Sequence, residues 1–441
     1  MANILKRLMI VFCCCALAPN ALAQSVEQLL QQAIETSPEV AKAKAQLLVA
    51  TADLKISKAS WLPQASARLY NGVGDTKQSN PFSSQRNANE NIQNNSVSVQ
   101  QNIYNKPASI QIEQTQLTVQ EAELRHALAI QSTIQNWVEK LMQCKQVSLR
   151  LKLAEQKAHT ALLKKTQTEQ SLKHGESSAL ELANALTDLS LRQAELGEAK
   201  HMLAQKLWEI SQLTGQTIEA SRIDKMEFTI PGKLISDREI EHRIIRQNLN
   251  LKIQSLYTDV AELEINKAKG QHYPTVKLVA QNTQSQSETA STLGNRVKQN
   301  VVALQVDIPL FNGFATQAQT EKASASLNKQ QADYENTLNQ AMRKAWTAMR
   351  QLDGATELLT AYGQAMESAT QQQEAIETAI KHQLATPFDL AQTREKLAEL
   401  QLKKLEHVMA ANKAYLQVQE LIGELNVENA AERISAIGKE Q

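Results

Sequence analysis

The sequence predicts a mostly helical α+β protein that is internally duplicated. Three observations predict this class: apolar residues at helical spacing over very long segments, alternating apolar and polar residues over shorter segments, and the recurrence of both patterns at a nearly constant offset. Aromatic residues make up only 4% of the 441 residues. Because bulky side chains are too few to fill large cores, we expect an elongated, thin-walled structure.

A long helical hairpin occurs twice. The first copy covers residues 107–215 and turns near Gly175, and the second covers residues 315–423 and turns near Gln383. Corresponding positions lie 208 residues apart at both ends, since 381 − 173 = 208 and 423 − 215 = 208. A constant offset over a whole hairpin indicates a duplicated unit.

The first arm of the second hairpin shows the clearest helical periodicity. No proline stands between Ala315 and His382, and the only interior glycines are Gly354 and Gly363. The apolar residues follow the 4, 3, 4, 3 spacing of a coiled-coil seam, at Leu338, Met342, Ala345, Met349 and Leu352. An unbroken helix of this length would extend over about 100 Å.

Each hairpin is preceded by a shorter helix and two strands. We expect one helix over residues 25–60, which stops before Pro63, and its counterpart over residues 237–269, which stops before Pro274. The prolines lie 274 − 63 = 211 residues apart, close to the hairpin offset. After each proline the residues alternate as in a sheet with one apolar and one wet face. The apolar sets are Ala65, Ala67 and Leu69; Val97 and Val99; Val276, Leu278 and Ala280; and Val302, Leu304, Val306, Ile308 and Leu310.

Several segments between these elements are too polar or too short to classify by periodicity. Residues 75–94 and 282–295 are rich in Asn, Ser and Gln, and we expect them to be solvent loops between paired strands. Residues 216–236 and 426–441 do not repeat one another in sequence. We expect them to form an irregular belt that contains a strand near Phe228.

The N-terminal segment has the features of a secretory signal. Lys6 and Arg7 precede an apolar run over residues 8–17, and Ala21-Leu22-Ala23 supplies small residues for cleavage. We therefore expect a signal peptide over residues 1–23 and export of the mature chain. Three of the 4 cysteines lie in that segment, and none stands where a lipoprotein needs its acylated first residue. Cys144 alone is left, so no intrachain disulfide is expected.

The strand count predicts an oligomer. After the signal peptide we find no apolar run near the roughly 20 residues that a membrane helix needs, so entry into a membrane would use strands. About four strands cannot close a barrel, because the smallest barrels need about eight, and an open edge in lipid would leave backbone groups unpaired. Other copies of the chain must complete the sheet. The net charge of +1 does not indicate the basic surface that a nucleic-acid-binding protein needs.

With these features the chain resembles the TolC family of outer-membrane efflux proteins. The resemblance rests on the duplicated order of elements, on Trp61-Leu62-Pro63 and His272-Tyr273-Pro274 before the strands, and on the passage Asp-Ile-Pro-Leu-Phe-Asn-Gly at 307–313. The first copy of that passage keeps Tyr104 but lacks the proline and the glycine. The resemblance implies a transmembrane β-barrel completed by trimerisation, with twelve strands in all, and continued by a long periplasmic α-helical barrel.

The resemblance also implies a function and partners. The chain would be the outer-membrane duct of a tripartite export system, working passively as a homotrimer surrounded by outer-membrane lipid. It would meet a periplasmic membrane-fusion adaptor and an inner-membrane ABC or RND pump, without a cofactor. We favour type I protein secretion, with small-molecule or multidrug efflux as the alternative. A periplasmic coiled-coil adaptor or a filament protein is the competing class, and nothing in the sequence has the residue spacing of an enzyme or a metal site.

The candidate functional residues lie at the two hairpin turns. The adaptor would contact the tips at Gly175, Glu176, Ser177 and Ser178 and at Gln383, Leu384, Ala385 and Thr386. By resemblance, acidic residues after the second turn constrict the entrance as rings. Asp389 matches the first such position, whereas the second is Gln392, so we expect one acidic ring instead of two.

These residues also have simpler interpretations. Asp389 would complement the dipole of the following helix, with Thr386 as its cap, and the turn residues would be connectors. His174 and His382 occupy equivalent positions and would place six imidazoles at a trimeric entrance, which suggests a pH-sensitive tip. The simpler interpretation, cationic residues that complement the dipole at helix C-termini, is the favoured one. Tyr70, Tyr104 and Tyr273 near strand ends suit an interfacial girdle or ordinary packing.

These observations divide the chain into five segments. We expect a signal peptide (1–23), a first structural repeat (24–214), an equatorial linker (215–236), a second structural repeat (237–425) and a C-terminal equatorial tail (426–441).

Overall fold

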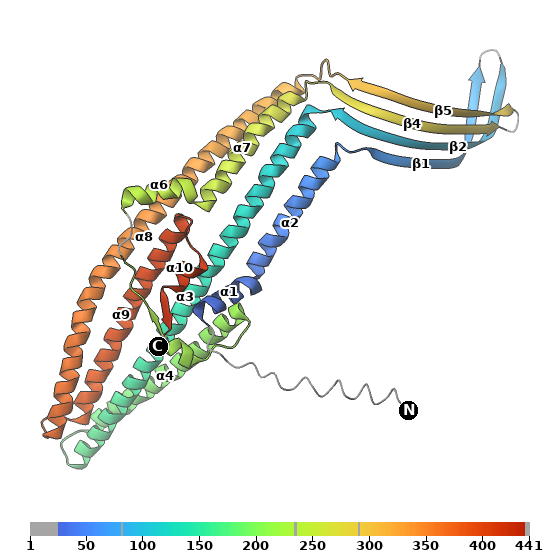
Figure 1. Ribbon diagram of the computed structural model, residues 1–441. Coiled ribbons are helices and arrows are strands. Elements are labelled where there is room, and N and C mark those ends of the chain that lie inside the picture. The colour runs from blue at the N-terminus through green and yellow to red at the C-terminus, as the bar shows by residue number, and fades with distance from the viewer. Residues whose placement is uncertain (1–24, 81–82, 233–235, 290–291, 437–441) are drawn as a thin grey trace, which may run out of the picture. The chain divides into compact units, whose positions relative to one another are not determined.

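The computed structural model describes residues 25–80, 83–232, 236–289 and 292–436 (Figure 1). The signal peptide expected over residues 1–23 and the end of the tail, 437–441, lie outside the described residues. The chain divides into two compact units, and each contains segments from both halves of the sequence. Unit 1 comprises Met1–Ala41, Leu128–Asn248 and Ala341–Gln441, and unit 2 comprises Lys42–Ala127 and Leu249–Gln340.

The elements follow the same order in both halves, which confirms the predicted mostly helical α+β class with internal duplication. The first half contains α1 (Val26–Thr36), α2 (Pro38–Ala59), β1 (Gln64–Asn80), β2 (Ser83–Tyr104), α3 (Lys106–Lys173), α4 (Ala179–Thr214), α5 (Ala220–Asp224) and β3 (Met226–Phe228). The second contains α6 (Asp237–Gln247), α7 (Leu249–Gly270), β4 (Thr275–Thr289), β5 (Thr292–Asp307), α8 (Ala315–Lys381), α9 (Pro387–Leu421), α10 (Val427–Ala431) and β6 (Ile434–Ala436).

The long arms of both hairpins are continuous helices, as predicted. α3 has 68 residues and α8 has 67, while the returning arms α4 and α9 have 36 and 35. Gly354 and Gly363 lie within α8 without interrupting it. Small apolar residues such as Ala341, Ala345 and Ala348 are buried along α8, so the helix packs closely without bulky side chains.

The single helix expected before each strand pair is in fact two helices, and this prediction was wrong. The first is broken at Ser37 (ψ 121°) and the second at Asn248 (ψ 122°), positions that are 248 − 37 = 211 residues apart. Ser37 precedes Pro38, and proline disfavours a helical conformation in the residue before it. Asn248 is buried, and its Nδ2 donates a hydrogen bond of 2.8 Å to the carbonyl of Leu421. A local signal therefore causes the first break, and a tertiary contact holds the second.

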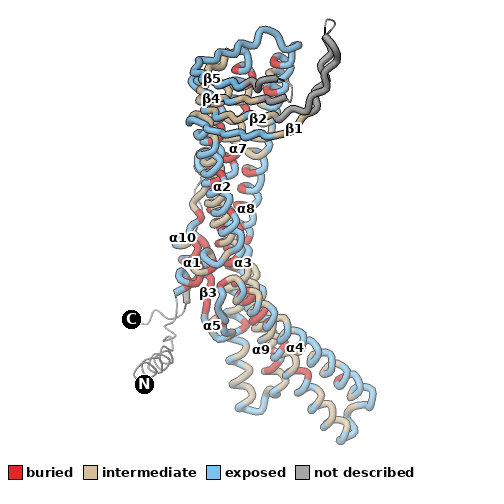
Figure 2. Tube along the Cα trace, turned by 90° about the vertical axis from the view of Figure 1, so that its right-hand side faces the viewer, coloured by how far each residue is buried: buried red, intermediate tan, exposed pale blue. Residues whose placement is uncertain are grey.

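Unit 2 contains a four-stranded antiparallel sheet in the order β1-β2-β4-β5 (Figure 1). Ala65 pairs with Val99, Val99 with Ala280, and Ala280 with Val302. Residues directly opposite each other in a ladder lie on the same side of a sheet, so the four apolar sets predicted from the sequence form one surface. We call it the apolar face. The sheet is coloured intermediate or exposed wherever its burial is shown (Figure 2).

The polar segments predicted as loops belong largely to the strands, so this prediction was wrong. Pairing between β1 and β2 continues through Asp75–Asn89, and β4 pairs with β5 as far as Thr289–Thr292. A tight antiparallel hairpin satisfies its backbone hydrogen bonds regardless of side-chain polarity. Apolar and polar residues alternate along a strand only when one of its faces is buried or in lipid. A strand whose two faces are both polar shows no alternation and cannot be recognised from this pattern.

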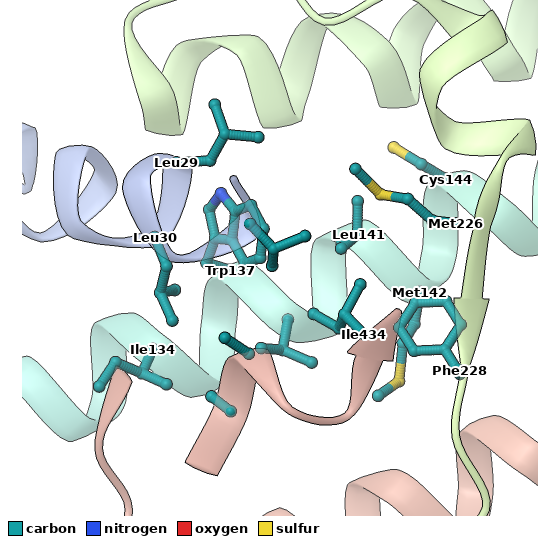
Figure 3. Close-up of a cluster of buried hydrophobic side chains, with 14 of the residues drawn as sticks. Leu29, Leu30, Ile134, Trp137, Leu141, Met142, Cys144, Met226, Phe228 and Ile434 are labelled. Carbon is teal, nitrogen blue, oxygen red and sulfur yellow. The ribbon is translucent and has the colours of Figure 1, made fainter. Parts of the chain in front are cut away.

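A hydrophobic cluster lies in unit 1 around Trp137 of α3, which is 0% exposed. Leu29 and Leu30 of α1 lie next to the indole, and Phe228 of β3 and Ile434 of β6 complete the cluster (Figure 3). Burying such side chains contributes roughly 1.5–3 kcal/mol each. The first and last elements of the described chain are therefore held by one core.

The belt segments repeat one another in structure, although their sequences do not. α5 and β3 are followed in the second half by α10 and β6, and the strands lie 434 − 226 = 208 residues apart. β3 and β6 form a two-stranded antiparallel sheet in which Phe228 pairs with Ile434, so the expected strand begins slightly earlier than Phe228. Asn412 of α9 donates a 3.0 Å hydrogen bond to the carbonyl of Thr229 and attaches this sheet to the helices.

No helix in the described part of the chain is both long enough and apolar enough to cross a membrane.

Candidate functional site

The two hairpin tips, both in unit 1, are built by the same local structure. α3 ends at Lys173 and α4 begins at Ala179, while α8 ends at Lys381 and α9 begins at Pro387. Each turn therefore spans five residues, 174–178 and 382–386, which include all the predicted adaptor contacts and both histidines. The structure places these predicted residues in two equivalent turns.

A left-handed residue ends each long helix. Gly175 has φ +76° and Gln383, at the equivalent position, has φ +59°. The N–H of Glu176 donates to the carbonyl of Ser171 and the N–H of Leu384 to that of Ala379, each at 2.9 Å. This arrangement closes the last helical turn in both hairpins. Glycine adopts the conformation without steric cost, whereas glutamine does not.

A reciprocal capping box begins each returning helix. The N–H of Asp389 donates to the hydroxyl of Thr386 at 3.2 Å, and the Thr386 N–H donates to the Asp389 carboxylate at 2.8 Å. In the first hairpin, Ser178 and Glu181 make the same two bonds, each at 3.2 Å. Both boxes satisfy backbone donors that would otherwise be unpaired at the helix start. The capping interpretation of Asp389 is thus observed directly.

The equivalent of Asp389 in the first hairpin is Glu181, which we did not select from the sequence. The signal was present, since 389 − 208 = 181 and both residues follow a hydroxyl-bearing residue by three positions. Glu181 also accepts a hydrogen bond from the hydroxyl of Ser177. Each tip therefore has one carboxylate tied to its own turn.

Hydrogen bonds keep these two carboxylates charged. Donation from the Thr386 hydroxyl and N–H lowers the pKa of Asp389, and donation from Ser177 and Ser178 lowers the pKa of Glu181. Both groups are therefore anionic at neutral pH, and both are accessible to solvent. An anion near the N-terminus of a helix is also stabilised by the helix dipole.

Gln392 lies one turn beyond Asp389 on α9 and is exposed. It lines a polar groove of about 340 Å³ together with Gln372 of α8 and Thr393, Glu395, Lys396 and Glu399 of α9. The groove contains no apolar lining residue, and in the described residues no group of histidine, cysteine or acidic side chains is arranged to hold a metal ion. Its chemistry suits polar contacts with a solvated partner.

Most of the remaining tip residues are solvent-exposed, whereas Ser177 and Ala385 are half-buried. His174 and His382 are both exposed, at the ends of α3 and α8. Leu384 is 82% exposed and Leu180, at the start of α4, is 70% exposed. An apolar side chain so fully exposed at a turn makes no contribution to the fold of its own chain. We did not select Leu180 from the sequence, because an isolated leucine at a helix start carries no distinctive pattern.

Ion pairs connect the helices that carry the tips. Lys140 of α3 pairs with Glu209 of α4 at 2.9 Å, Lys157 of α3 with Glu399 of α9 at 3.5 Å, and Arg394 of α9 with Glu377 of α8 at 3.1 Å. Lys206 and Lys140 lower the pKa of Glu209 to about 2. Exposed pairs of this kind contribute little to stability, so they chiefly align the helices.

Comparison with known proteins reveals relatives of a single kind. The sequence profile of the family described as "Outer membrane efflux protein" matches residues 29–216 and 242–424. The chain is 25% identical to the proteases secretion protein PrtF of Dickeya chrysanthemi over 210 residues, which cover 47% of this chain and 45% of that protein. It is 19% identical to the outer membrane protein TolC of Vibrio cholerae over 433 residues, 96% of each chain.

The fold also matches solved structures. The outer membrane channel CmeC of Campylobacter jejuni superposes with a TM-score of 0.71 at 13% identity, covering 92% of this chain and 89% of that one. At this identity the likeness concerns the fold.

Proposed function

The chain belongs to the outer membrane efflux protein family, and from that premise we propose that it is the outer-membrane channel of a tripartite export system. The observation that carries the proposal is the sheet of unit 2. Four strands expose a common apolar face, and β1 and β5 stand at its edges, each with one side that pairs with no strand in the described chain. Lipid offers no hydrogen-bond partners to the backbone N–H and C=O groups of an open sheet edge, so further copies of the chain must supply the pairing strands.

The proposed assembly is a homotrimer with a twelve-stranded barrel in the outer membrane and a periplasmic tube of helices. The exposed apolar face suits contact with lipid, and the polar helices suit a wall wetted on both sides. The channel conducts passively, while an inner-membrane pump performs the work through a periplasmic adaptor. The exposed turns 174–178 and 382–386, with Leu384 and Leu180, are the surface proposed to meet that adaptor.

Asp389 is proposed to form the acidic ring at the periplasmic entrance. Its charge at neutral pH and its accessibility support this role. The capping box is compatible with it, because a carboxylate that accepts bonds from Thr386 keeps its negative charge. Gln392 would occupy the second constriction without charge. His174 and His382 would place imidazole side chains beside the entrance.

The proposed cargo is a protein exported by type I secretion. The name of PrtF, which links that relative to protease secretion, supports this choice. Deleting the gene from its host should remove one or more large proteins from the culture medium, measured by comparing the extracellular proteins of the two strains. An unchanged set of extracellular proteins, together with increased sensitivity to small toxic compounds, would favour a duct for small molecules instead.

Native mass spectrometry and bilayer recording test the channel itself. The detergent-solubilised protein should have the mass of a trimer and conduct ions across a planar bilayer. A monomer that stays soluble without detergent would contradict the proposal and would favour an adaptor or a filament protein.

A further inference from the structure

On β5, the apolar residues of the apolar face give way to a cationic segment, whereas β1 keeps the exposed Leu69 and Val73 on this face. Val302, Leu304 and Val306 lie on this face, followed beyond the strand by Ile308 and Leu310, and all five are exposed. In the opposite direction along β5, the same face continues with Asn300, Lys298 and Arg296. The change from apolar to charged takes only four residues, about 13 Å along a strand.

Register confirms that the cations share the face of the apolar residues. Val302 pairs with Ala280, Asn300 with Asn282, Lys298 with Gln284 and Arg296 with Gln286, without irregularity over this range. Among the side chains that the structure describes on this face, Lys298 and Arg296 are the only charged ones. Both side chains are exposed. The Nε–H of Arg296 donates a hydrogen bond of 3.0 Å to Oε1 of Gln286, which holds the guanidinium against the sheet.

The opposite end of the apolar band carries aromatic residues. Phe311 and Phe314 form an edge-to-face pair with ring centroids 5.4 Å apart, and they are 76% and 69% exposed. The nine positions from Val302 to Leu310 match the roughly 9–11 residues that a tilted strand needs to cross a hydrocarbon layer. The two ends of the band thus differ in chemistry, with aromatic rings at one end and cations at the other.

We infer that Lys298 and Arg296 form a binding site for the phosphate groups of lipids that surround the barrel, at its end away from the helices. Arginine and lysine bind phosphate by charge and by hydrogen bonding, and long cationic side chains can reach from a strand into a headgroup layer. The flanking amides Gln284 and Gln286 provide further polar groups in the adjacent strand. At the outer surface of an outer membrane, the partner would be a phosphorylated glycolipid such as lipid A. This inference rests on the proposed membrane barrel.

Titration of the detergent-solubilised protein with lipid A, read by native mass spectrometry, tests the site. We expect bound lipid A on the wild type, with affinity reduced about tenfold or more in the double variant Arg296→Gln/Lys298→Gln. The charge-preserving variant Arg296→Lys/Lys298→Arg should retain binding. The matched control is Lys322→Gln/Lys329→Gln, which removes two exposed cations from α8 and should bind as the wild type does.

Equal binding by the wild type and Arg296→Gln/Lys298→Gln would overturn the inference, and so would an equal loss in the α8 control. A parallel flotation assay with phosphatidylcholine vesicles separates this result from failure of the proposed function. If the wild type floats with the vesicles while lipid A binding is insensitive to the double variant, only the site is wrong. If the wild type does not associate with vesicles, both proposals fail.

Discussion

Asp389 combines two properties in one carboxylate, since it caps α9 and carries a negative charge at the tip. The capping interpretation could be predicted from Thr386 three residues earlier, and the structure shows both bonds of the box. The ring interpretation depends on how copies of the chain assemble, which local sequence does not encode. Variants that separate charge from capping address the two properties individually.

Asp389→Asn should lower single-channel cation conductance if the charge lies at the entrance, because the amide keeps an acceptor oxygen but loses the negative charge that attracts cations into the pore. Thr386→Ala should leave conductance unchanged and cost about 1 kcal/mol of stability through loss of the cap. Planar-bilayer recording and thermal unfolding measure the two effects. Equal conductance in Asp389→Asn and the wild type would remove the argument for an acidic ring.

Gln383→Gly should stabilise the second tip by about 1 kcal/mol, because Gln383 adopts the left-handed conformation that favours glycine. Gly175→Gln, the reverse exchange at the equivalent position, should destabilise the first tip by a similar amount. Thermal unfolding followed by circular dichroism measures both. No change in either variant would show that the turns relax without strain.

The two tips should lose stability in acid. Hydrogen bonding lowers the folded-state pKa of Asp389 and Glu181, so their contribution is present above the ordinary values near pH 4 and is lost as pH falls through the lowered values. Hydrogen exchange of amides in the first turns of α4 and α9 should therefore lose protection below about pH 4. In Asp389→Ala, the α9 amides should lack this acid-dependent step while those of α4 keep it.

At the scale of elements, short segments were harder to predict than long ones. The long helices follow from tens of residues of regular spacing, whereas β3 and β6 have three residues each and no measurable period. Their pairing depends on burial around Trp137 and on the bond from Asn412 to Thr229. Such contacts join residues far apart in sequence, so only the folded chain reveals them.

Asn412→Leu should destabilise unit 1 by about 1–3 kcal/mol, because the carbonyl of Thr229 would lose its buried donor. Asn412 is 0% exposed, whereas Asn336 of α8 is exposed and serves as a control. Denaturant unfolding should show the loss for Asn412→Leu and little change for Asn336→Leu. Equal midpoints for both variants would mean that the belt is held by apolar burial alone.

At the scale of the whole molecule, the two faces of the sheet are expected to lie in different environments. Val302 and Val301 are neighbours on β5 with side chains on opposite faces. Val302→Lys should reduce insertion into membranes, because a lysine on the lipid-facing side costs free energy that rises from about 1 kcal/mol or less near the interface to about 2–4 kcal/mol at the bilayer midplane. Val301→Lys should be tolerated, because its face is expected to line a wet interior. Flotation with vesicles measures insertion, and equal behaviour of the two variants would contradict the assignment of the faces.

The elements that repeat over many residues can be derived from the amino-acid sequence alone. Periodicity and constant offsets predicted the helices α3, α4, α8 and α9, the four strands and their apolar face. These patterns arise because the same kind of contact recurs at every turn of a helix or at every second residue of a strand. Pro38 explains the break at Ser37 from the local sequence. Tertiary contacts, by contrast, account for the break at Asn248, the extension of the strands through polar segments, and the pairing of β3 with β6. These features depend on single buried contacts or on backbone hydrogen bonds between distant segments, which leave no period in the side-chain sequence.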